Sequence, residues 1–194
     1  MSNCAIGFRV HSGWAAAVAV TEGPKVVDRR VIVIADPAID GSKQPFHAAE
    51  GRPFKKAEDL ILRCGESTNA LAAAALGEML TGLRTDHKVI GCGLLLSSTR
   101  TLPDLKAILA SHAMIHAAEG EFFRDAMARS ARNCRLPVHR VREKDLWRTC
   151  ESEMHVPAEA LARRIGALGK ELGPPWRQDE KLAALVAWLV LATQ

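Results

Sequence analysis

The stretch CAIGFRVHSGWAAAVAVTEGPKVVDRRVIVIA, residues 4–35, contains three β-rich runs separated by two turn sequences. The runs are Cys4–Val10, Trp14–Glu22 and Val26–Ala35. His11-Ser12-Gly13 and Gly23-Pro24 connect them, and glycine and proline at such points are typical of tight turns. Short turns place successive strands side by side in opposite directions, so the stretch predicts an antiparallel meander.

The rest of the chain alternates between helical and strand-like patterns. Residues 36–53 collect glycines and prolines and predict a long loop, which in a compact domain is often functional or mobile. Further strands are expected at 88–96 and 136–141, and helices at 54–84, 101–133, 144–152, 157–172 and 177–193. A meander followed by βα units predicts an α/β protein with a mixed five-stranded sheet and helices on both faces. We expect one domain over residues 1–194, with 143–175 as a candidate helical insertion before the last helix.

Local signals also predict where two of these helices begin or break. The Cys64-Gly65 pair is expected to interrupt the helix at 54–84. Thr101 is expected to cap the helix at 101–133, with Asp104 three residues later in a capping-box position. Gly120 is the expected point at which that helix kinks or divides.

The composition places the chain among globular proteins. Its 194 residues are 48% hydrophobic and 25% charged, and such a chain is not expected to be disordered. Five cysteines without finger-like spacing indicate buried thiols in a reducing compartment. The N-terminus has no convincing secretory signal, and the apolar run at 182–192 is shorter than the roughly 20 residues that span a membrane. We therefore expect a cytoplasmic protein with no membrane partner.

Positive charge is concentrated in residues 124–148, although the whole chain has a net charge of only +4. This segment contains eight arginines or lysines against three acidic residues. Such a segment either meets phosphate groups or forms a solvated helix face.

The segment SHAMIHAAEGEFFR, residues 111–124, places ionisable side chains on an otherwise apolar helix. At 100° per residue, His112, His116 and Glu119 project within about 60° of one another. Ile115 and Phe123 share this side, so the three polar groups are expected to be half buried. Burying them without partners is costly, so we expect them to be satisfied by each other, by other side chains, or by a metal or ligand.

A short phrase of this segment also occurs in the loop at 36–53. The phrase is FHAAEG at 46–51 and IHAAEG at 115–120, and each copy places a histidine three residues before a glutamate. Imidazole and carboxylate groups at that spacing suit a divalent metal, for which Mg²⁺, Mn²⁺ and Zn²⁺ are the candidates. The predicted metal ligands are His47, Glu50, His116 and Glu119, with His112 as a fifth ligand or a supporting partner.

Other interpretations of the same residues remain open. The phrase is also an ordinary product of an alanine-rich chain, with the histidines bonded to backbone carbonyls. Without a metal, an imidazole held by Glu119 would titrate near neutrality and serve general acid–base catalysis. Arg124 and the basic segment would then hold an anionic substrate.

A turn rich in hydroxyl groups follows the strand predicted at 88–96. Ser97, Ser98, Thr99 and Arg100 precede a helix N-terminus, where free backbone N–H groups favour an anion. These four residues and Arg124 are the predicted anion-binding residues. Capping of the helix is the competing interpretation.

The element order, with IGFRVHSGWAAAVAV at 6–20 and QDEKLAALVAWLVLA at 178–192, resembles the ribonuclease H-like superfamily. In its Holliday-junction resolvases, strand one carries a metal-binding aspartate, a Gly-rich turn leads to a GW-type second strand, and an acidic residue opens an alanine-rich last helix. Gly13-Trp14 matches the second feature, and Asp179 with Glu180 matches the third. Phe8 or Arg9 takes the place of the strand-one aspartate, and the strand ending LLLSS supplies no carboxylate.

The resemblance implies the fold and leaves two hypotheses for function. A two-metal centre needs several converging carboxylates, which this sequence does not supply from the usual places. The first hypothesis is metal-assisted phosphoester hydrolysis or nucleic-acid processing by a non-standard site, with His112, His116, Glu119 and Asp179 as the catalytic residues. The second is a non-catalytic module that binds nucleic acid or a protein partner. Binding of a phosphorylated ligand at 97–101 is a third possibility, and the oligomeric state is left open.

Overall fold

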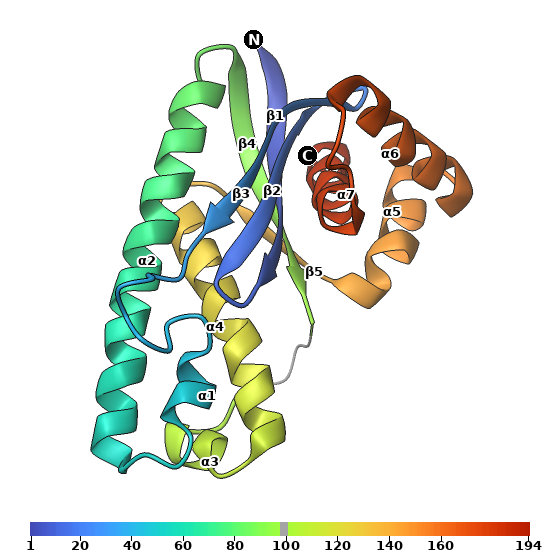
Figure 1. Cartoon of the computed structure of the whole chain (residues 1–194). Coiled ribbons are helices and arrows are strands. Elements are labelled where there is room, and N and C mark those ends of the chain that lie inside the picture. Colours follow the sequence, from blue (N-terminus) through green and yellow to red (C-terminus); the bar gives the residue numbers. More distant parts are fainter. Residues whose placement is uncertain (98–100) are drawn as a thin grey trace.

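A five-stranded mixed sheet forms the centre of the computed structural model, which describes residues 1–97 and 101–194 (Figure 1). Its strands are β1 (Ser2–His11), β2 (Trp14–Thr21), β3 (Lys25–Val33), β4 (His87–Leu96) and β5 (Val138–Arg142). The spatial order is β3-β2-β1-β4-β5; β1, β2 and β3 pair antiparallel, and β1, β4 and β5 pair parallel. The predicted meander and the mixed five-stranded sheet are therefore confirmed.

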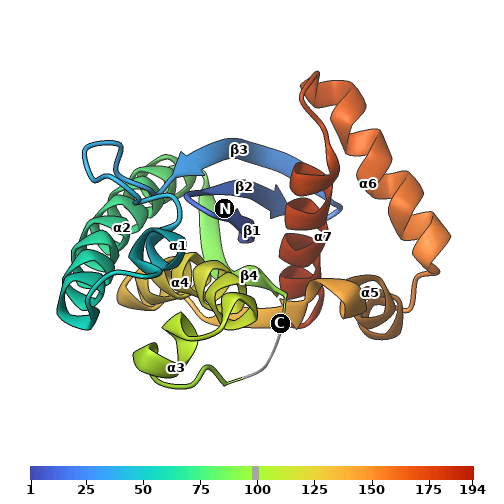
Figure 2. The same ribbon diagram turned by 60° about the horizontal axis from the view of Figure 1, so that its bottom comes forward.

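Helices cover both faces of the sheet, as predicted (Figure 2). They are α1 (Pro45–Ala49), α2 (Phe54–Leu83), α3 (Leu105–Leu109), α4 (His112–Asn133), α5 (Leu146–Met154), α6 (Ala158–Leu172) and α7 (Gln178–Ala192), with a short 3₁₀ turn η1 (Glu143–Asp145). Helices α2 and α4 lie on one face, and α7 lies on the other with α5 and α6 outside it. In the described part of the chain, no helix has the length and apolar character needed to cross a membrane.

Alternation along β1 sends successive side chains to the two cores. Phe8 is buried among residues of α2 and α4, whereas Ala5 is buried with α7. Helix α7 is apolar nearly all round because the sheet covers one side of it and α5 and α6 cover much of the other. The helix comes so close to the sheet that a methyl group on Gly7 would overlap the carbonyl oxygen of Ala183.

Four local predictions about helices and loops were wrong. The expected loop at 36–53 contains the short helix α1, and α2 runs through Cys64-Gly65 without a break. The helix expected at 101–133 is two helices, which meet at Ala110 and Ser111. Asp104, and not Thr101, is the N-cap of the first, because its carboxylate accepts the backbone N–H of Ala107 at 2.8 Å.

Gly120 lies inside α4 and does not divide it. A Cβ atom at this position would lie 2.6 Å from Nη1 of Arg124, one turn further along the helix. The glycine therefore makes room for a guanidinium group that folds back along the helix, which explains its presence without any helix break.

We predict that Gly7→Ala destabilises the protein by about 3 kcal/mol or more, because the methyl group would push α7 away from the sheet. Urea unfolding monitored by circular dichroism would measure the change. Gly77→Ala is the matched control, since Gly77 lies in α2 with open space around it and should gain about 0.5–1 kcal/mol. Equal effects of the two substitutions would contradict the proposed close contact.

Candidate functional site

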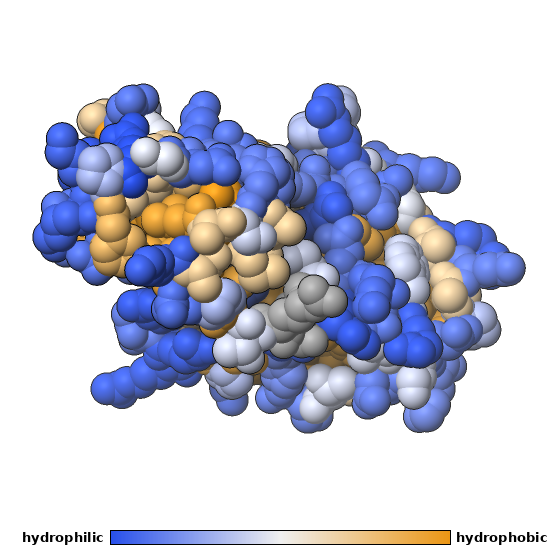
Figure 3. All heavy atoms as spheres, turned by 90° about the horizontal axis from the view of Figure 1, so that it is seen from below, coloured by the Kyte–Doolittle hydropathy of each residue, from blue (hydrophilic) through white to orange (hydrophobic). Residues whose placement is uncertain are grey.

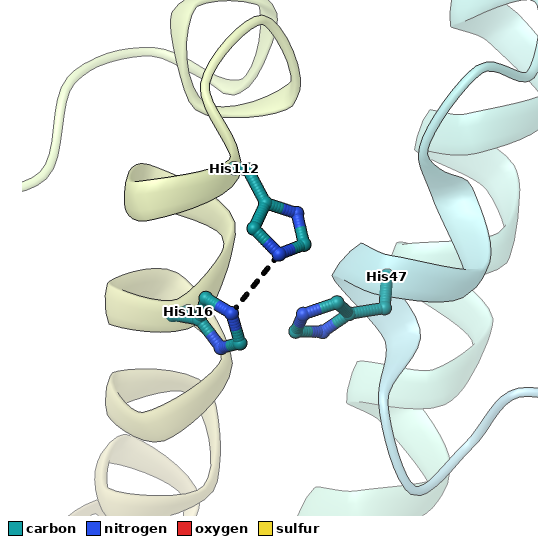
Figure 4. A group of neighbouring side chains, drawn as sticks. All are labelled: His47, His112 and His116. Atoms are coloured by element: carbon teal, nitrogen blue, oxygen red, sulfur yellow. Dashed lines mark hydrogen bonds between the residues drawn. The ribbon is translucent and has the colours of Figure 1, made fainter.

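Three histidines from two helices meet with their rings pointing toward one another (Figure 4). His47 comes from α1, and His112 and His116 lie one turn apart on α4. One ring nitrogen of each lies within 4.8 Å of the other two, and the Nε2 atoms of His112 and His116 are 3.2 Å apart. The ring centroid of His116 lies 4.6 Å from that of each other histidine. The structure thus brings the two copies of the repeated phrase together.

Apolar neighbours hold α1 against α4. Phe46, directly before His47, is buried with Ile108 and Ile115, and its ring meets Phe122 edge to face at 5.8 Å. The four-residue spacing of His112 and His116 places both imidazoles on one face of α4. Hydrophobic packing of the adjacent residues therefore fixes the positions of the histidines.

Glu119 lies behind His47 and holds its ring. The glutamate is only 3% exposed, and its carboxylate accepts Nδ1–H of His47 at 2.7 Å and the backbone N–H of His47 at 3.2 Å. Burial raises the pKa of Glu119, and the hydrogen bonds from His47 partly oppose that effect. Because Nδ1 is used for Glu119, Nε2 of His47 is left for the other two histidines.

Glu50, the glutamate of the phrase at 46–51, lies beside His112, just as Glu119 lies beside His47. Oε1 of Glu50 lies 3.5 Å from Nδ1 of His112. Each phrase therefore provides a carboxylate beside a histidine of the other segment. A carboxylate behind an imidazole is the usual arrangement for a histidine that binds metal, because it fixes the tautomer and the ring orientation.

The spacing of His112 and His116 fits two ligands of a tetrahedral metal, and His47 lies within reach of the same ion. Metal–nitrogen bonds of about 2.0–2.1 Å at tetrahedral angles separate the nitrogens by about 3.3 Å. The observed Nε2–Nε2 distance of His112 and His116 is 3.2 Å. Three imidazoles suit Zn²⁺ or a similar ion, whereas Mg²⁺ prefers oxygen ligands.

The expectation that all three polar groups of α4 are half buried was wrong for two of them. Glu119 is buried, but His112 and His116 are exposed. The first turns of α4 extend past the end of the sheet, so little covers their outer side (Figure 1). Figure 3 shows this end of the molecule, which is mostly hydrophilic with an apolar area on the side of α1 and α2. The imidazoles are therefore open to a dissolved ion or substrate.

Asp179 is placed away from the three histidines. It lies in the first turn of α7, on the opposite face of the sheet from α4, and its partners are Arg9 and His11. The Nε2 atom of His11 lies 2.7 Å from Oδ1 of Asp179, and the His11 ring stacks on Trp14 at 4.4 Å. The structure does not bring Asp179 together with the other residues predicted to be catalytic.

The predicted anion-binding residues also separate. Arg124 lies eight residues after His116, about 12 Å along the helix axis. Its side chain is 13% exposed, burial lowers its pKa, and Glu121 lies 4.0 Å away. Ser97 lines a cleft of about 250 Å³ beside α4, together with Thr101 and Glu121. Ser98, Thr99 and Arg100 lie outside the described residues.

Carboxylates of the same chain form ion pairs with several arginines of the basic segment, residues 124–148. Arg140 pairs with Asp125 at 2.9 Å and lies 3.7 Å from Glu121. Arg142 and Arg148 both pair with Asp145. These pairs agree with the interpretation of the segment as a solvated face, and they leave fewer charges for phosphate groups.

Sequence reasoning missed the cluster formed by Arg9, Glu143 and His11 around Asp179. Nε and Nη2 of Arg9 bind Glu143 at 3.0 and 2.7 Å, and Nη1 binds Asp179. The one available signal was an arginine within an otherwise apolar strand. Nothing in the sequence identifies Glu143 as its partner, because 134 residues separate the two.

The arrangement of the elements is that of the ribonuclease H-like fold of Holliday-junction resolvases. The structure of Thermus thermophilus RuvC in complex with a Holliday junction substrate matches with a TM-score of 0.58 and 10% identity, over 97% of this chain and 92% of that one. A second Thermus thermophilus RuvC structure matches with a TM-score of 0.54 and 11% identity, over 97% and 93%. No protein-family model and no curated protein sequence matches the chain.

We predict that Asp179→Asn destabilises the protein by about 1–3 kcal/mol at neutral pH, since hydrogen bonds between charged groups are lost. Although burial raises the pKa of Asp179, the hydrogen bonds from His11 and Arg9 outweigh it and lower the pKa below its usual value. The unfolded chain therefore takes up the proton first as pH falls, and the contribution of Asp179 disappears as pH falls through the lowered pKa. Free energies of unfolding measured from pH 7 downwards should show the variant and the wild type converging.

Asp40→Asn is the control for this titration. Asp40 is exposed and its side chain has no hydrogen-bond partner among the described residues. A difference between Asp179→Asn and the wild type that stays constant from neutral to acid pH would show that the carboxylate charge does not stabilise the fold.

Proposed function

We propose that the protein binds a divalent metal ion of the Zn²⁺ type through His47, His112 and His116 and hydrolyses phosphoester bonds in nucleic acid. The convergence of three imidazoles, of which His112 and His116 are exposed and His47 is half-buried, carries this proposal, and carboxylates lie behind two of them. When bound, a metal ion with three protein ligands and an open position supplies a water of lowered pKa and polarises a phosphoryl oxygen.

Each residue of the centre has a part in this proposal. The three histidines hold the ion through their ring nitrogens. Glu119 is predicted from the sequence to be a ligand, but its contacts favour a different role, in which it fixes the tautomer and orientation of His47. Glu50 is 44% exposed at its side chain and lies beside His112, where it can steady that ring or accept a proton from water.

The fold likeness to a resolvase bound to a junction supports nucleic acid as the substrate class. A cleft of about 250 Å³ lies along another face of α4, lined by Ala113 and Ala117 and by none of the three histidines, and we assign the nucleic-acid backbone to it. The hydroxyl groups of Ser97 and Thr101 at the same cleft are suited to phosphate oxygens.

We predict that the protein loaded with Zn²⁺ and freed of excess retains about one ion per chain by plasma emission. His116→Ala should reduce this to background, because two imidazoles hold Zn²⁺ much less tightly than three. Glu119→Gln should weaken Zn²⁺ binding about 10- to 100-fold, since His47 loses the group that orients it. Cleavage of branched and linear DNA and of RNA should depend on the ion and be lost in His116→Ala.

His155→Asn is the matched control. His155 is exposed on the far side of the molecule and has a positive φ of 53°, which asparagine tolerates well. It should bind and cleave as the wild type does. Protein that remains metal-free after loading, yet binds nucleic acid with a steep salt dependence, would contradict the enzymatic proposal and favour the binding module.

A further inference from the structure

The cluster around Arg9 occupies the place where the resemblance to resolvases implies a metal centre. That resemblance implies one carboxylate on strand one and another at the start of the last helix. Here the second is present as Asp179 on α7, and β1 passes beside it. The sequence left Phe8 and Arg9 as alternatives for the strand-one position.

Successive side chains of β1 point to opposite faces of the sheet, and this decides between Phe8 and Arg9. Phe8 faces the core formed with α2 and α4 and is 1% exposed. Arg9 faces α7, and its guanidinium lies between Asp179 and Glu143. A positive group therefore stands where the strand-one carboxylate would meet the carboxylate of the last helix.

The contacts of the guanidinium use the oxygens that a cation would need. Both oxygens of Glu143 and one oxygen of Asp179 bind Arg9, and His11 binds the same Asp179 oxygen. The hydrogen bonds that Arg9 donates to Glu143 raise the pKa of Arg9, so the group stays charged. The charge of Arg124 also acts on Glu143. Three of the four carboxylate oxygens are thus already occupied, and a divalent cation here would be repelled by Arg9.

We infer that the Arg9 guanidinium takes the place of a divalent cation at this centre and that the wild-type chain binds no metal there. The residues present therefore do not fit a ribonuclease H-type metal pair. The guanidinium instead joins β1 to η1 and α7 by charged hydrogen bonds. It follows that Arg9, which binds both carboxylates, is the group that keeps them from a cation, and its replacement by an acidic residue creates an oxygen-ligand site.

The test is Arg9→Asp with Mg²⁺ as the probe. The substitution adds a third carboxylate beside Asp179 and Glu143 and removes the positive charge, which gives the oxygen ligands that Mg²⁺ prefers. We expect Mg²⁺ at ten times its dissociation constant to raise the melting temperature of the variant by about 3–6 °C and to leave that of the wild type unchanged. Mg²⁺ is a poor match for the three imidazoles, so the result is independent of the Zn²⁺ proposal.

Arg132→Asp is the charge-matched control, since Arg132 is exposed on α4 and has no carboxylate within salt-bridge distance among the described residues. Its melting temperature should not respond to Mg²⁺. A folded Arg9→Asp protein without a Mg²⁺ response would overturn the inference.

A second measurement applies if Arg9→Asp does not fold on its own. Refolding with Mg²⁺ but not without it supports the inference. If Arg9→Asp folds neither with nor without Mg²⁺, the test is calorimetric titration of the wild type and of Asp179→Asn with Mg²⁺. Absence of binding heat in both supports the inference, and binding by the wild type that Asp179→Asn abolishes overturns it.

Discussion

Direct contact between α7 and the backbones of β1 and β4 determines how the rest of the molecule is arranged. Gly7 and Gly93 have no side chains, so the helix backbone at Ala183 and Val186 reaches the sheet itself. A sheet buried in this way on both faces needs helices on each side, and α7 in turn needs α5 and α6 to cover its outer surface. The same contact sets the first turn of α7 beside β1, and this is why Asp179 meets Arg9.

The sequence predicted the features that depend on local periodicity and turn chemistry. The meander follows from the turns at Gly13 and Gly23, both of which have positive φ, and the two covered faces follow from the apolar runs. Features that depend on distant partners were not predictable. The break lies at Ser111, which has an extended backbone and begins α4 as its N-cap, and the continuity of α2 at Gly65 reflects packing against Phe122.

The same distinction between local and distant signals applies to the candidate site. The four-residue spacing of His112 and His116 and the echo of their phrase around His47 were visible in the sequence, and the structure places the three together. The role of Glu119 in holding His47 could not be predicted from the sequence, because it depends on how the fold places the backbone of α1 beside the carboxylate. The grouping with Asp179 assumed that residues of similar chemistry share a cleft, but α4 and α7 lie on opposite faces of the sheet.

The two clusters differ in the chemistry that they offer a cation. Beside the central strand β1, the carboxylates are hard oxygen ligands, and a guanidinium already binds them. On α1 and α4, the imidazoles offer nitrogen ligands, and their supporting carboxylates lie behind the rings. His47 comes from the loop between β3 and α2, which is not part of the element order that defines the fold. A fold is a scaffold on which loops place chemistry, and the proposed metal centre follows this rule because the loop adds His47 to the two histidines of α4.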